Sequence, residues 1–437
     1  MAFSTDTRTL QAGDTYVAIR GETHDGHAFV ADAIAKGARA VVVDTVPEAD
    51  DGAEVADGAE VILTGDTVGW LVQRASERVR DLGCETVAIT GSVGKTTTRT
   101  AIASVLRQSR TILASTGNLN TPLGLSLTLL NADLAPDTVL VLEMGARMAG
   151  DIRELCAAFP PTVGVVTNVR GVHLETLGSL EGVEREKSEI VRALPASGTA
   201  VLNGDDPRTR RMAEVTAASV LTYGTAPDCD VTPGDVTARL PILGDHAIYT
   251  AMVATAVGRA LGLEPGAITR GLEAIEPEKG RLRRLAGRAG STLVDDTYNA
   301  SPDAVVSALG VLAGLDGKRR TAFLGDMLEL GDTEVEQHGA VLAEALRQAD
   351  RVVAVGPIMD QARHTLAEAS RVDWYPSSQA AAEAIRGGAL PVAAGDVLLV
   401  KGSQGTRMER VSEALLAPDL DPAAVLPRQT PQWKAIA

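Results

Sequence analysis

The chain has little cysteine, no long apolar run and no excess of positive charge. Its 437 residues contain three cysteines, odd in number and without metal-binding spacing, at Cys84, Cys156 and Cys229. This usage indicates a reducing compartment and argues against a thiol metal site. No apolar run approaches the length of a membrane span, and the first residues lack the basic and apolar regions of a signal peptide. We therefore expect a cytoplasmic protein with no membrane partner.

The formal net charge of −16 disfavours nonspecific binding to nucleic acid. Lysine is also scarce, since only seven of the 41 basic residues are lysines: Lys36, Lys95, Lys187, Lys279, Lys318, Lys401 and Lys434. A GC-rich genome would explain the bias toward arginine but not the positions that remain lysine. A compact or deprotonatable amine is the reason to keep lysine, and three of the seven lie in segments with other polar signals.

Apolar strand-like segments alternate with helix-like segments along most of the chain. We expect strands at 15–19, 38–43, 60–65, 87–89, 138–145, 162–169, 199–204, 291–296, 320–327, 351–356 and 396–402. Helices are expected at 29–37, 70–82, from 96 onward, at 245–263 and after each of the last four strands. This alternation predicts an α/β protein with mainly parallel sheets. The length fits two to four domains, and we place boundaries near 82 and 282.

The stretch "VAITGSVGKTTTRT" has the layout of a phosphate-binding loop between a strand and a helix. Gly91 and Gly94 can adopt backbone angles closed to other residues, and the helix that follows would point free N–H groups at an anion. Lys95 would neutralise phosphate charge and Thr96 would bind Mg²⁺. The usual loop has its first glycine where this chain has Ile89. The alternative is an ordinary strand–turn–helix connection.

Polar residues follow several of the expected strands, and ligands collect at the carboxyl ends of strands in open α/β sheets. Glu143 ends one strand and is either a Mg²⁺ ligand or a buried acid paired with an arginine. His173 follows another strand and is either structural or a metal ligand. Asp296 and Lys401 end two later strands, where the alternatives are helix capping and solvated charge. Lys187 lies in a charged helix, and on its own that context predicts a lysine facing solvent.

Taken together, the motifs resemble the Mur ligase family over nearly the whole chain. The resemblance is carried by "STDTRTLQAGDTYVAIRGETHDGHAF", "TGSVGKTT", "TGNLNTPLGLSLTLL", "LEMGARMAGDI", "TNVRGVHLETLGS", "LNGDDP", "DDTYNASPD", "GDMLELGD" and "LVKGS". The family has its own shortened phosphate loop, which accounts for Ile89. "DDTYNA" and "GDMLELG" point to the branch that adds D-alanyl-D-alanine.

The resemblance implies a three-domain architecture. Residues 1–82 would form a shortened amino-terminal domain that binds the UDP-linked substrate. Residues 83–281 would form a central ATP-binding domain with a P-loop ATPase-like parallel or mixed sheet. Residues 282–437 would form a carboxyl-terminal Rossmann-like ligase domain.

The resemblance also implies roles for individual residues. ATP would contact Gly91, Ser92, Val93, Gly94, Lys95, Thr96, Thr97, Arg281, Asp296 and Asn299. Mg²⁺ would be held by Thr96, Glu143, His173 and Lys187, the last after carbamylation by CO₂. The implied catalytic residues are Lys95, Lys187 and His173. The implied substrate-binding residues are Thr5, Asp6, Arg8, Asn120, Lys401 and Ser403.

The implied activity is ATP-dependent formation of an amide bond through an acyl phosphate, in the synthesis of peptidoglycan precursors. The partners would then be small molecules, a UDP-linked peptide and a dipeptide, and we expect a monomer. One alternative is a paralogue that joins a different acid and amine, and another is a nucleotide-dependent regulator. Ala247 and Thr250 replace two family asparagines, which predicts weaker reading of adenine, and Gln404 replaces a family arginine.

Overall fold

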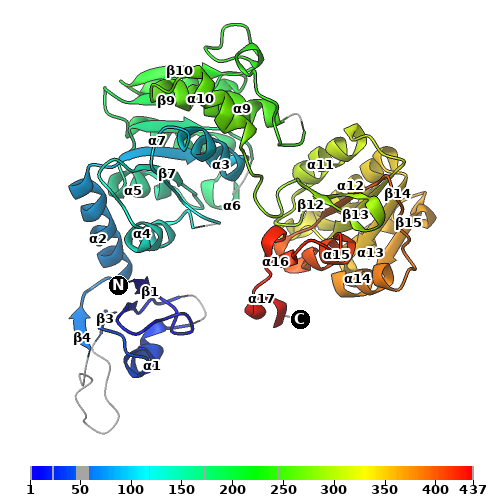
Figure 1. Ribbon diagram of the computed structural model, residues 1–437, viewed down its shortest axis with the longest axis horizontal. Coiled ribbons are helices and arrows are strands. Elements are labelled where there is room, and N and C mark those ends of the chain that lie inside the picture. Colours follow the sequence, from blue (N-terminus) through cyan, green and yellow to red (C-terminus); the bar gives the residue numbers. More distant parts are fainter. Residues whose placement is uncertain are drawn as a thin grey trace. The chain divides into compact units, whose positions relative to one another are not determined.

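The computed structural model describes residues 2–21, 24–45, 59–117, 119–171, 174–244 and 246–435. These residues form two compact units, one made of 1–238 with 249–274 and the other of 239–248 with 275–437. The first unit contains two sheets and the second contains one, and helices pack against each of them (Figure 1). Within the described ranges, no helix combines the length and apolarity needed to cross a membrane.

The first sheet is small and parallel, with strand order β1-β2-β3-β4. Its strands are β1 (Phe3–Ser4), β2 (Thr15–Val17), β3 (Ala40–Val43) and β4 (Glu60–Leu63), and α1 (Val30–Ala35) packs on β3. Helix α2 (Thr67–Leu82) begins where the Asp66 carboxylate accepts a hydrogen bond from Gly69 N and ends at Gly83, whose φ of 62° suits glycine. Leu71 of α2 shares a buried core with Val17, Val42 and the helices of the second sheet.

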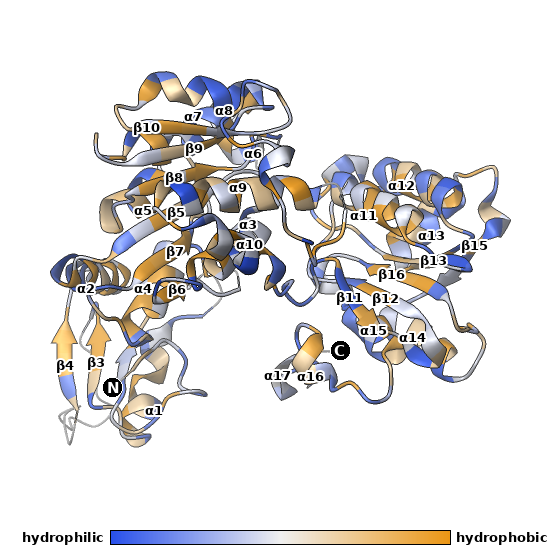
Figure 2. Cartoon of the chain, turned by 45° about the horizontal axis from the view of Figure 1, so that its top comes forward, coloured by the Kyte–Doolittle hydropathy of each residue, from blue (hydrophilic) through white to orange (hydrophobic). Residues whose placement is uncertain are grey.

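The second sheet has six parallel strands in the order β10-β9-β8-β5-β7-β6. They are β5 (Glu85–Thr90), β6 (Ile112–Ala114), β7 (Val139–Glu143), β8 (Val163–Val166), β9 (Thr199–Asn203) and β10 (Ser219–Tyr223). Its helices are α3 (Lys95–Leu106), α4 (Pro122–Asn131), α5 (Asp151–Ala158), α6 (Leu174–Leu177), α7 (Leu180–Arg192), α8 (Pro207–Arg211), α9 (His246–Ala260) and α10 (Pro265–Glu273). The central strands are apolar along their length (Figure 2), as expected where helices cover both faces of a parallel sheet.

The third sheet has the order β11-β12-β16-β13-β14-β15, with β11 antiparallel to β12 and the other pairs parallel. Its strands are β11 (Arg283–Ala286), β12 (Thr292–Asp296), β13 (Arg319–Gly325), β14 (Arg351–Val355), β15 (Val372–Tyr375) and β16 (Asp396–Lys401). Its helices are α11 (Pro302–Gly314), α12 (Glu334–Gln348), α13 (Pro357–Arg363), α14 (Ser378–Arg386), α15 (Glu409–Leu415), α16 (Pro422–Val425) and α17 (Pro431–Ala435).

The sequence-based prediction of an α/β protein with mainly parallel sheets is confirmed. The strands expected from apolar runs are present, and a helix follows each of β12, β13, β14 and β16. Five strands were missed: β1, β6, β10, β11 and β15. The central sheet, predicted as parallel or mixed, is parallel throughout.

Candidate active site

The loop between β5 and α3 is built to accept an anion. Gly91 has a φ of 142°, and a Cβ on it would lie 2.0 Å from the Thr167 hydroxyl oxygen, so only glycine fits. Asn168, at the end of β8, receives a hydrogen bond from Val93 N at 3.0 Å on its side-chain oxygen. Ser92 N donates to the main-chain oxygen of Asn168 at 3.0 Å. The neighbouring strand therefore fixes the loop before any ligand arrives.

Lys95 is the first residue of α3, and its ammonium folds back over the loop. Its Nζ donates to Gly91 O at 2.7 Å and to Ser92 O at 3.3 Å. The free N–H groups at the start of α3 face the same loop. Thr97 is half-buried in this first turn, and Val93 is exposed at the tip of the loop. The arrangement can therefore surround a phosphate with one ammonium and several amide donors.

Glu143 ends β7 and collects three side chains around its carboxylate. Thr96 Oγ1 donates to Oε2 at 2.9 Å and Asn120 Nδ2 donates to Oε1 at 3.0 Å. Arg99, which the sequence analysis missed, lies with its guanidinium 3.7 Å from Oε2, and Glu143 is 3% exposed. Glu143 is thus a buried acid beside an arginine, as one alternative expected. Its carboxylate and the Thr96 hydroxyl are also hard oxygen ligands of the kind Mg²⁺ binds, so these residues fit that ion.

Lys187 does not face solvent, so the expectation from its helix alone was wrong. Its side chain is buried at 2% exposure. Burial, together with the nearby charge of Lys95, lowers the pKa of Lys187 to about 8. Among the described residues, no hydrogen bond or ion pair to its ammonium is found. An amine with this pKa is neutral in about one molecule in ten at pH 7, far more often than an ordinary lysine, and the neutral form is the one that reacts with CO₂.

The sequence of α7 contains a helical pattern of buried positions, although most of its residues are polar or charged. The buried positions include Val183, Glu186, Lys187, Ile190 and Val191, which follow the i, i+3, i+4, i+7, i+8 spacing of a helix face directed into a core. The Glu186 carboxylate accepts hydrogen bonds from Gly150 N at 2.7 Å and Ile152 N at 2.8 Å. Since this acid is occupied by the start of α5, it does not pair with the neighbouring lysine.

The other residues predicted from the first 250 positions are not part of the phosphate loop. His173 lies outside the described residues. Asp6 and Arg8 form an ion pair of 2.7 Å after β1, which lowers the pKa of Asp6, and Thr5 is half-buried beside them. Ala247 and Thr250 are buried near the start of α9, where the chain passes from the second unit into the first.

The second unit holds a cluster at the carboxyl ends of β12 and β16. Lys401 Nζ lies 2.6 Å from Asp296 Oδ2 and donates to Asn299 O at 2.9 Å. Lys401 and Asp296 are 3% and 6% exposed, so the alternative of solvated charge was wrong. Ser403 Oγ accepts a hydrogen bond from Leu328 N at 2.9 Å. The cluster is a buried, mutually satisfied ion pair.

Two further residues flank this cluster. The Arg281 guanidinium lies 4.1 Å from the ring centroid of Tyr298, in cation–π geometry. The side chain of Asn299 is exposed. Asp295 turns away from Lys401 toward Ser412, and burial raises its pKa to about 6. Arg281, Asp296 and Asn299 therefore occupy one loop region of the second unit.

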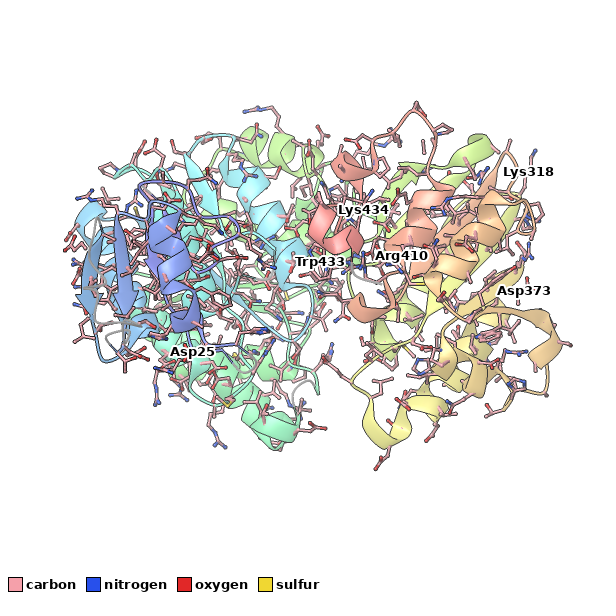
Figure 3. All side chains as sticks on the ribbon, turned by 90° about the horizontal axis from the view of Figure 1, so that it is seen from below. Asp25, Lys318, Asp373, Arg410, Trp433 and Lys434 are labelled. Carbon is pink, nitrogen blue, oxygen red and sulfur yellow. The ribbon has the colours of Figure 1, made fainter. Side chains whose placement is uncertain are left out.

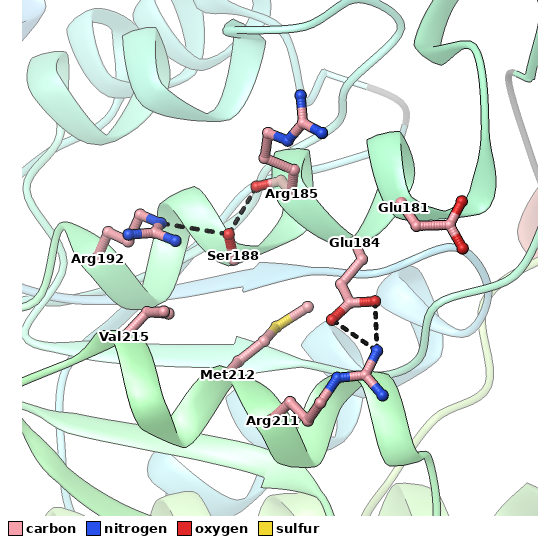
Figure 4. Close-up of a pocket in the computed structure, with 8 residues that line it drawn as sticks. All are labelled: Glu181, Glu184, Arg185, Ser188, Arg192, Arg211, Met212 and Val215. Carbon is pink, nitrogen blue, oxygen red and sulfur yellow. Dashed lines mark hydrogen bonds and ion pairs between the residues drawn. The ribbon is translucent and has the colours of Figure 1, made fainter.

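A pocket of about 330 Å³ lies on another face of α7, against Arg211, Met212 and Val215 near α8 (Figure 4). Glu184 on its wall pairs with Arg211 at 2.9 Å. None of the predicted site residues lines it. The chemistry-bearing groups gather instead at the strand ends, so we assign the candidate site to the phosphate loop and its neighbours.

Comparison with known proteins is consistent along the whole chain. Residues 2–82 match the profile described as Mur ligase family, catalytic domain, 89–258 match the Mur ligase middle domain, and 280–404 match the Mur ligase glutamate ligase domain. The chain is 32% identical to UDP-N-acetylmuramoyl-tripeptide–D-alanyl-D-alanine ligase of Bacillus subtilis, covering 94% of this chain and 92% of that one. Identity to the Escherichia coli ligase of the same name is 33%, covering 95% and 93%. The crystal structure of MurF ligase from Thermotoga maritima in complex with ADP superimposes with a TM-score of 0.79 at 27% identity, covering 94% and 96%.

Proposed function

Because the chain belongs to the Mur ligase family and is a ligase that forms peptide bonds, we propose that it joins D-alanyl-D-alanine to UDP-N-acetylmuramoyl-tripeptide at the expense of ATP. The observation that carries the proposal is the grouping of Lys95, Thr96, Glu143 and Lys187 around one glycine-rich loop. The name of the two curated relatives supplies the substrates, and their similarity spans nearly the full chain.

The phosphate loop would bind the triphosphate of ATP. The amide groups of residues 91–97 and the Lys95 ammonium supply donors and positive charge without rearrangement of the loop, since Asn168 already holds it. Such preorganised charge is most effective where charge develops in the transition state. The relative whose crystal structure contains ADP supports an adenine nucleotide as a ligand of this chain.

The proposed reaction has two steps. A carboxylate oxygen of the tripeptide attacks the γ-phosphorus of ATP, and the bond from that phosphorus to the β–γ bridging oxygen breaks, which gives an acyl phosphate and ADP. The amine of the dipeptide then attacks the acyl carbon, an amide bond forms, the amine loses a proton, and inorganic phosphate leaves. Lys95 would offset the charge that moves onto the phosphate oxygens.

Mg²⁺ would be held by the Thr96 hydroxyl and the Glu143 carboxylate, with His173 and a carbamate on Lys187 as further ligands, and it would neutralise phosphate charge. The support for the carbamate is the buried amine with a lowered pKa. Carbamylation converts this cation into an anion, which changes the Lys95–Lys187 pair from mutual repulsion to attraction. The negative charge of the carbamate would then favour Mg²⁺ beside the loop.

In the second unit, Arg281, Asp296 and Asn299 would contribute to nucleotide binding. Lys401 and Ser403 would bind the incoming dipeptide. The Asn299 side chain is exposed and has no hydrogen bond within the described ranges, so its amide can meet a ligand. Thr5, Asp6 and Arg8 of the first sheet would contact the UDP group.

The test is a ligation assay on the purified chain with ATP, UDP-N-acetylmuramoyl-tripeptide and D-alanyl-D-alanine. We expect ADP release that requires both co-substrates and a product whose mass equals the two joined parts minus water. Other dipeptides and amino acids serve as parallel amines, and a clear preference for one of them would favour the paralogue with a different amine. ATP hydrolysis that is independent of any acceptor would contradict the proposal.

A further inference from the structure

A cavity of about 170 Å³ lies in the second unit between α14, α15 and the last described residues. The chain carries 57 acidic and 41 basic residues, yet this lining is rich in cations. Two acids line it, Glu409 and Glu413, against five cations: Arg386, Arg407, Arg410, Arg428 and Lys434. Among the described lining residues the cations therefore outnumber the acids by three, in a protein that is negative overall, and Arg407 and Arg410 have further interactions besides.

Glu409 is already used by the arginines around it. It is 1% exposed, and its Oε1 lies 2.5 Å from Arg407 Nε while its Oε2 lies 3.0 Å from Arg428 Nη2. The second acid, Glu413, lies 3.5 Å from the Lys434 ammonium. Neither acid is therefore available to balance Arg386, whose exposed side chain has no hydrogen bond or ion pair among the described residues.

The Arg428 side chain also has an unused donor. It is 7% exposed, and its Nε is buried without a hydrogen-bond partner in the described part of the chain. A buried N–H of a charged group that lacks a partner is unfavourable, and a bound anion would remove that penalty. This donor belongs to a residue that lines the cavity.

The backbone at this site is strained in the same residues. Arg407 and Arg428 have φ values of 55° and 54°, in the left-handed region that residues with a Cβ rarely adopt. Both bind Glu409 and both line the cavity. Strained residues of this kind concentrate at ligand clamps, where the surrounding structure holds them in place.

We propose that this cavity binds a phosphate-sized oxyanion, supplied as inorganic phosphate. Planar guanidinium groups match the geometry of phosphate oxygens, and a neighbouring ammonium adds charge. The cavity is smaller than the roughly 300–1,000 Å³ typical of sites for drug-sized molecules, which fits a small anion. The site lies wholly in the second unit, does not use the phosphate loop, and does not depend on the proposed function.

Arg428 also connects this cavity with the segment that contains Asp296 and Asn299, two residues proposed to bind the nucleotide. Arg428 donates to the main-chain oxygen of Tyr298 at 3.2 Å and to that of Thr297. These carbonyls lie between Asp296 and Asn299 in the sequence. An anion that engages Arg428 would therefore stabilise this loop, and hydrogen exchange of residues 297–299 should slow when phosphate binds.

The test is a titration of the full-length Lys95→Ala chain with inorganic phosphate at constant ionic strength. The Lys95→Ala background removes the ammonium of the phosphate loop, so that loop contributes little. Calorimetry measures the affinity, and the part of the fluorescence change that is lost in Trp433→Phe reports this location, because the Trp433 ring centroid lies 5.5 Å from Arg407. Figure 3 shows Trp433 and Lys434 together near Arg410, with Lys318 farther away in the same unit.

We expect saturable 1:1 binding that weakens about tenfold in Arg386→Gln and by a smaller factor in Lys434→Gln, because each loses one charge that faces the anion. The matched controls Arg347→Gln and Lys318→Gln remove the same charge from exposed positions outside the cavity and should bind as the parent does. Arg428→Gln should show the largest loss, and the two rim variants keep the test decisive if that chain does not fold.

Absence of saturable binding, or equal weakening in the cavity variants and their controls, would overturn the proposal. Two further titrations, with ADP and with acetate, distinguish free phosphate from other anions. Binding of ADP with the same dependence on Arg386, but no binding of phosphate, would overturn the assignment to free phosphate. Acetate that binds as tightly as phosphate would overturn it in favour of carboxylates.

Discussion

Lys187 in the first unit and Lys401 in the second are buried to almost the same degree, at 2% and 3% exposure. Lys401 has an aspartate at 2.6 Å and a carbonyl at 2.9 Å. Lys187 has no such partner among the described residues, and burial and the repulsive charge of Lys95 lower its pKa more than the charges of Glu186 and Asp151 raise it. Burial alone therefore does not decide what a lysine does. A partner fixes the position of the amine, whereas burial beside another cation makes an amine easier to deprotonate and to modify.

The largest expected effect comes from Lys95, which connects this comparison to the phosphate loop. We expect Lys95→Ala to abolish measurable ligation while the chain stays folded, because no other lysine lies on the loop that would hold the phosphates. The same change should raise the pKa of Lys187, since the Lys95 charge is one cause of its lowering. Turnover assays and circular dichroism test the first outcome, and turnover at the wild-type rate would refute the site.

Lys187→Ala should lower kcat by about 10³-fold, the size expected when one charged group is removed from a transition state. Added acetate or formate should restore part of the activity, because a short carboxylate can take the place of the carbamate. The control is Arg185→Ala, an exposed residue on the same helix, which should retain full activity. If acetate fails to help and Arg185→Ala is equally impaired, the lysine acts only through the helix.

Replacing each of the two lysines should have clearly different effects on the free energy of unfolding. Lys401→Met leaves Asp296 buried without its partner and should cost about 3–5 kcal/mol in the free energy of unfolding. Lys187→Met removes a buried amine with no partner and should be neutral or stabilising, since the methionine side chain is of similar length and apolar. Urea denaturation of both variants measures the difference. A larger loss in Lys187→Met than in Lys401→Met would reverse the comparison.

The pH dependence of stability gives a smaller but specific effect. The pKa of Lys187 is lowered from 10.5 to about 8 in the folded chain, so between these values the unfolded chain binds more protons than the folded one. Stability should therefore rise with pH across this window in CO₂-free buffer, with a slope of up to about 1.4 kcal/mol per pH unit from this group. The slope should vanish in Lys187→Met and persist in Arg185→Ala. An unchanged slope in Lys187→Met would assign it to another group.

The smallest expected effect concerns Ser403, which supports the second cluster. Ser403→Ala removes the hydroxyl that accepts from Leu328 N and should lower the free energy of unfolding by about 1–2 kcal/mol. If Ser403 also binds the dipeptide, KM for that substrate should rise while KM for ATP stays constant. A loss of stability without a change in either KM would leave Ser403 with a structural role alone.

The sequence predicted the strands that are buried on both faces, because such strands are continuous apolar runs. β7 and β16 are examples, and the residues that end them, Glu143 and Lys401, follow directly from that position. The missed strands are short or lie at sheet edges. β6 has three residues, and β11 begins with two arginines and pairs on one side only. Edge strands lack the apolar pattern that made the others visible.

The sequence predicted which residues belong to the site more readily than it predicted which residues they contact. Arg99 and Glu186 are buried charged residues whose roles depend on segments far away in the chain, Glu143 in one case and the start of α5 in the other. The burial of Lys187 could have been predicted from the i, i+3, i+4 spacing with Val183 and Glu186. The lack of a hydrogen-bond or ion-pair partner for Lys187 could not have been predicted in this way, since it depends on which side chains the fold brings near the amine.

Carbamylation of Lys187 underlies both the proposed Mg²⁺ site and the contrast with Lys401, and ¹³C NMR of the chain equilibrated with ¹³C-labelled bicarbonate tests it most directly. We predict one carbamate resonance in the wild-type chain and in Lys401→Met, and none in Lys187→Ala. Acidification should remove the signal, because protonation of the amine reverses the reaction. A wild-type chain without a carbamate resonance, or a resonance that survives in Lys187→Ala, would contradict the account.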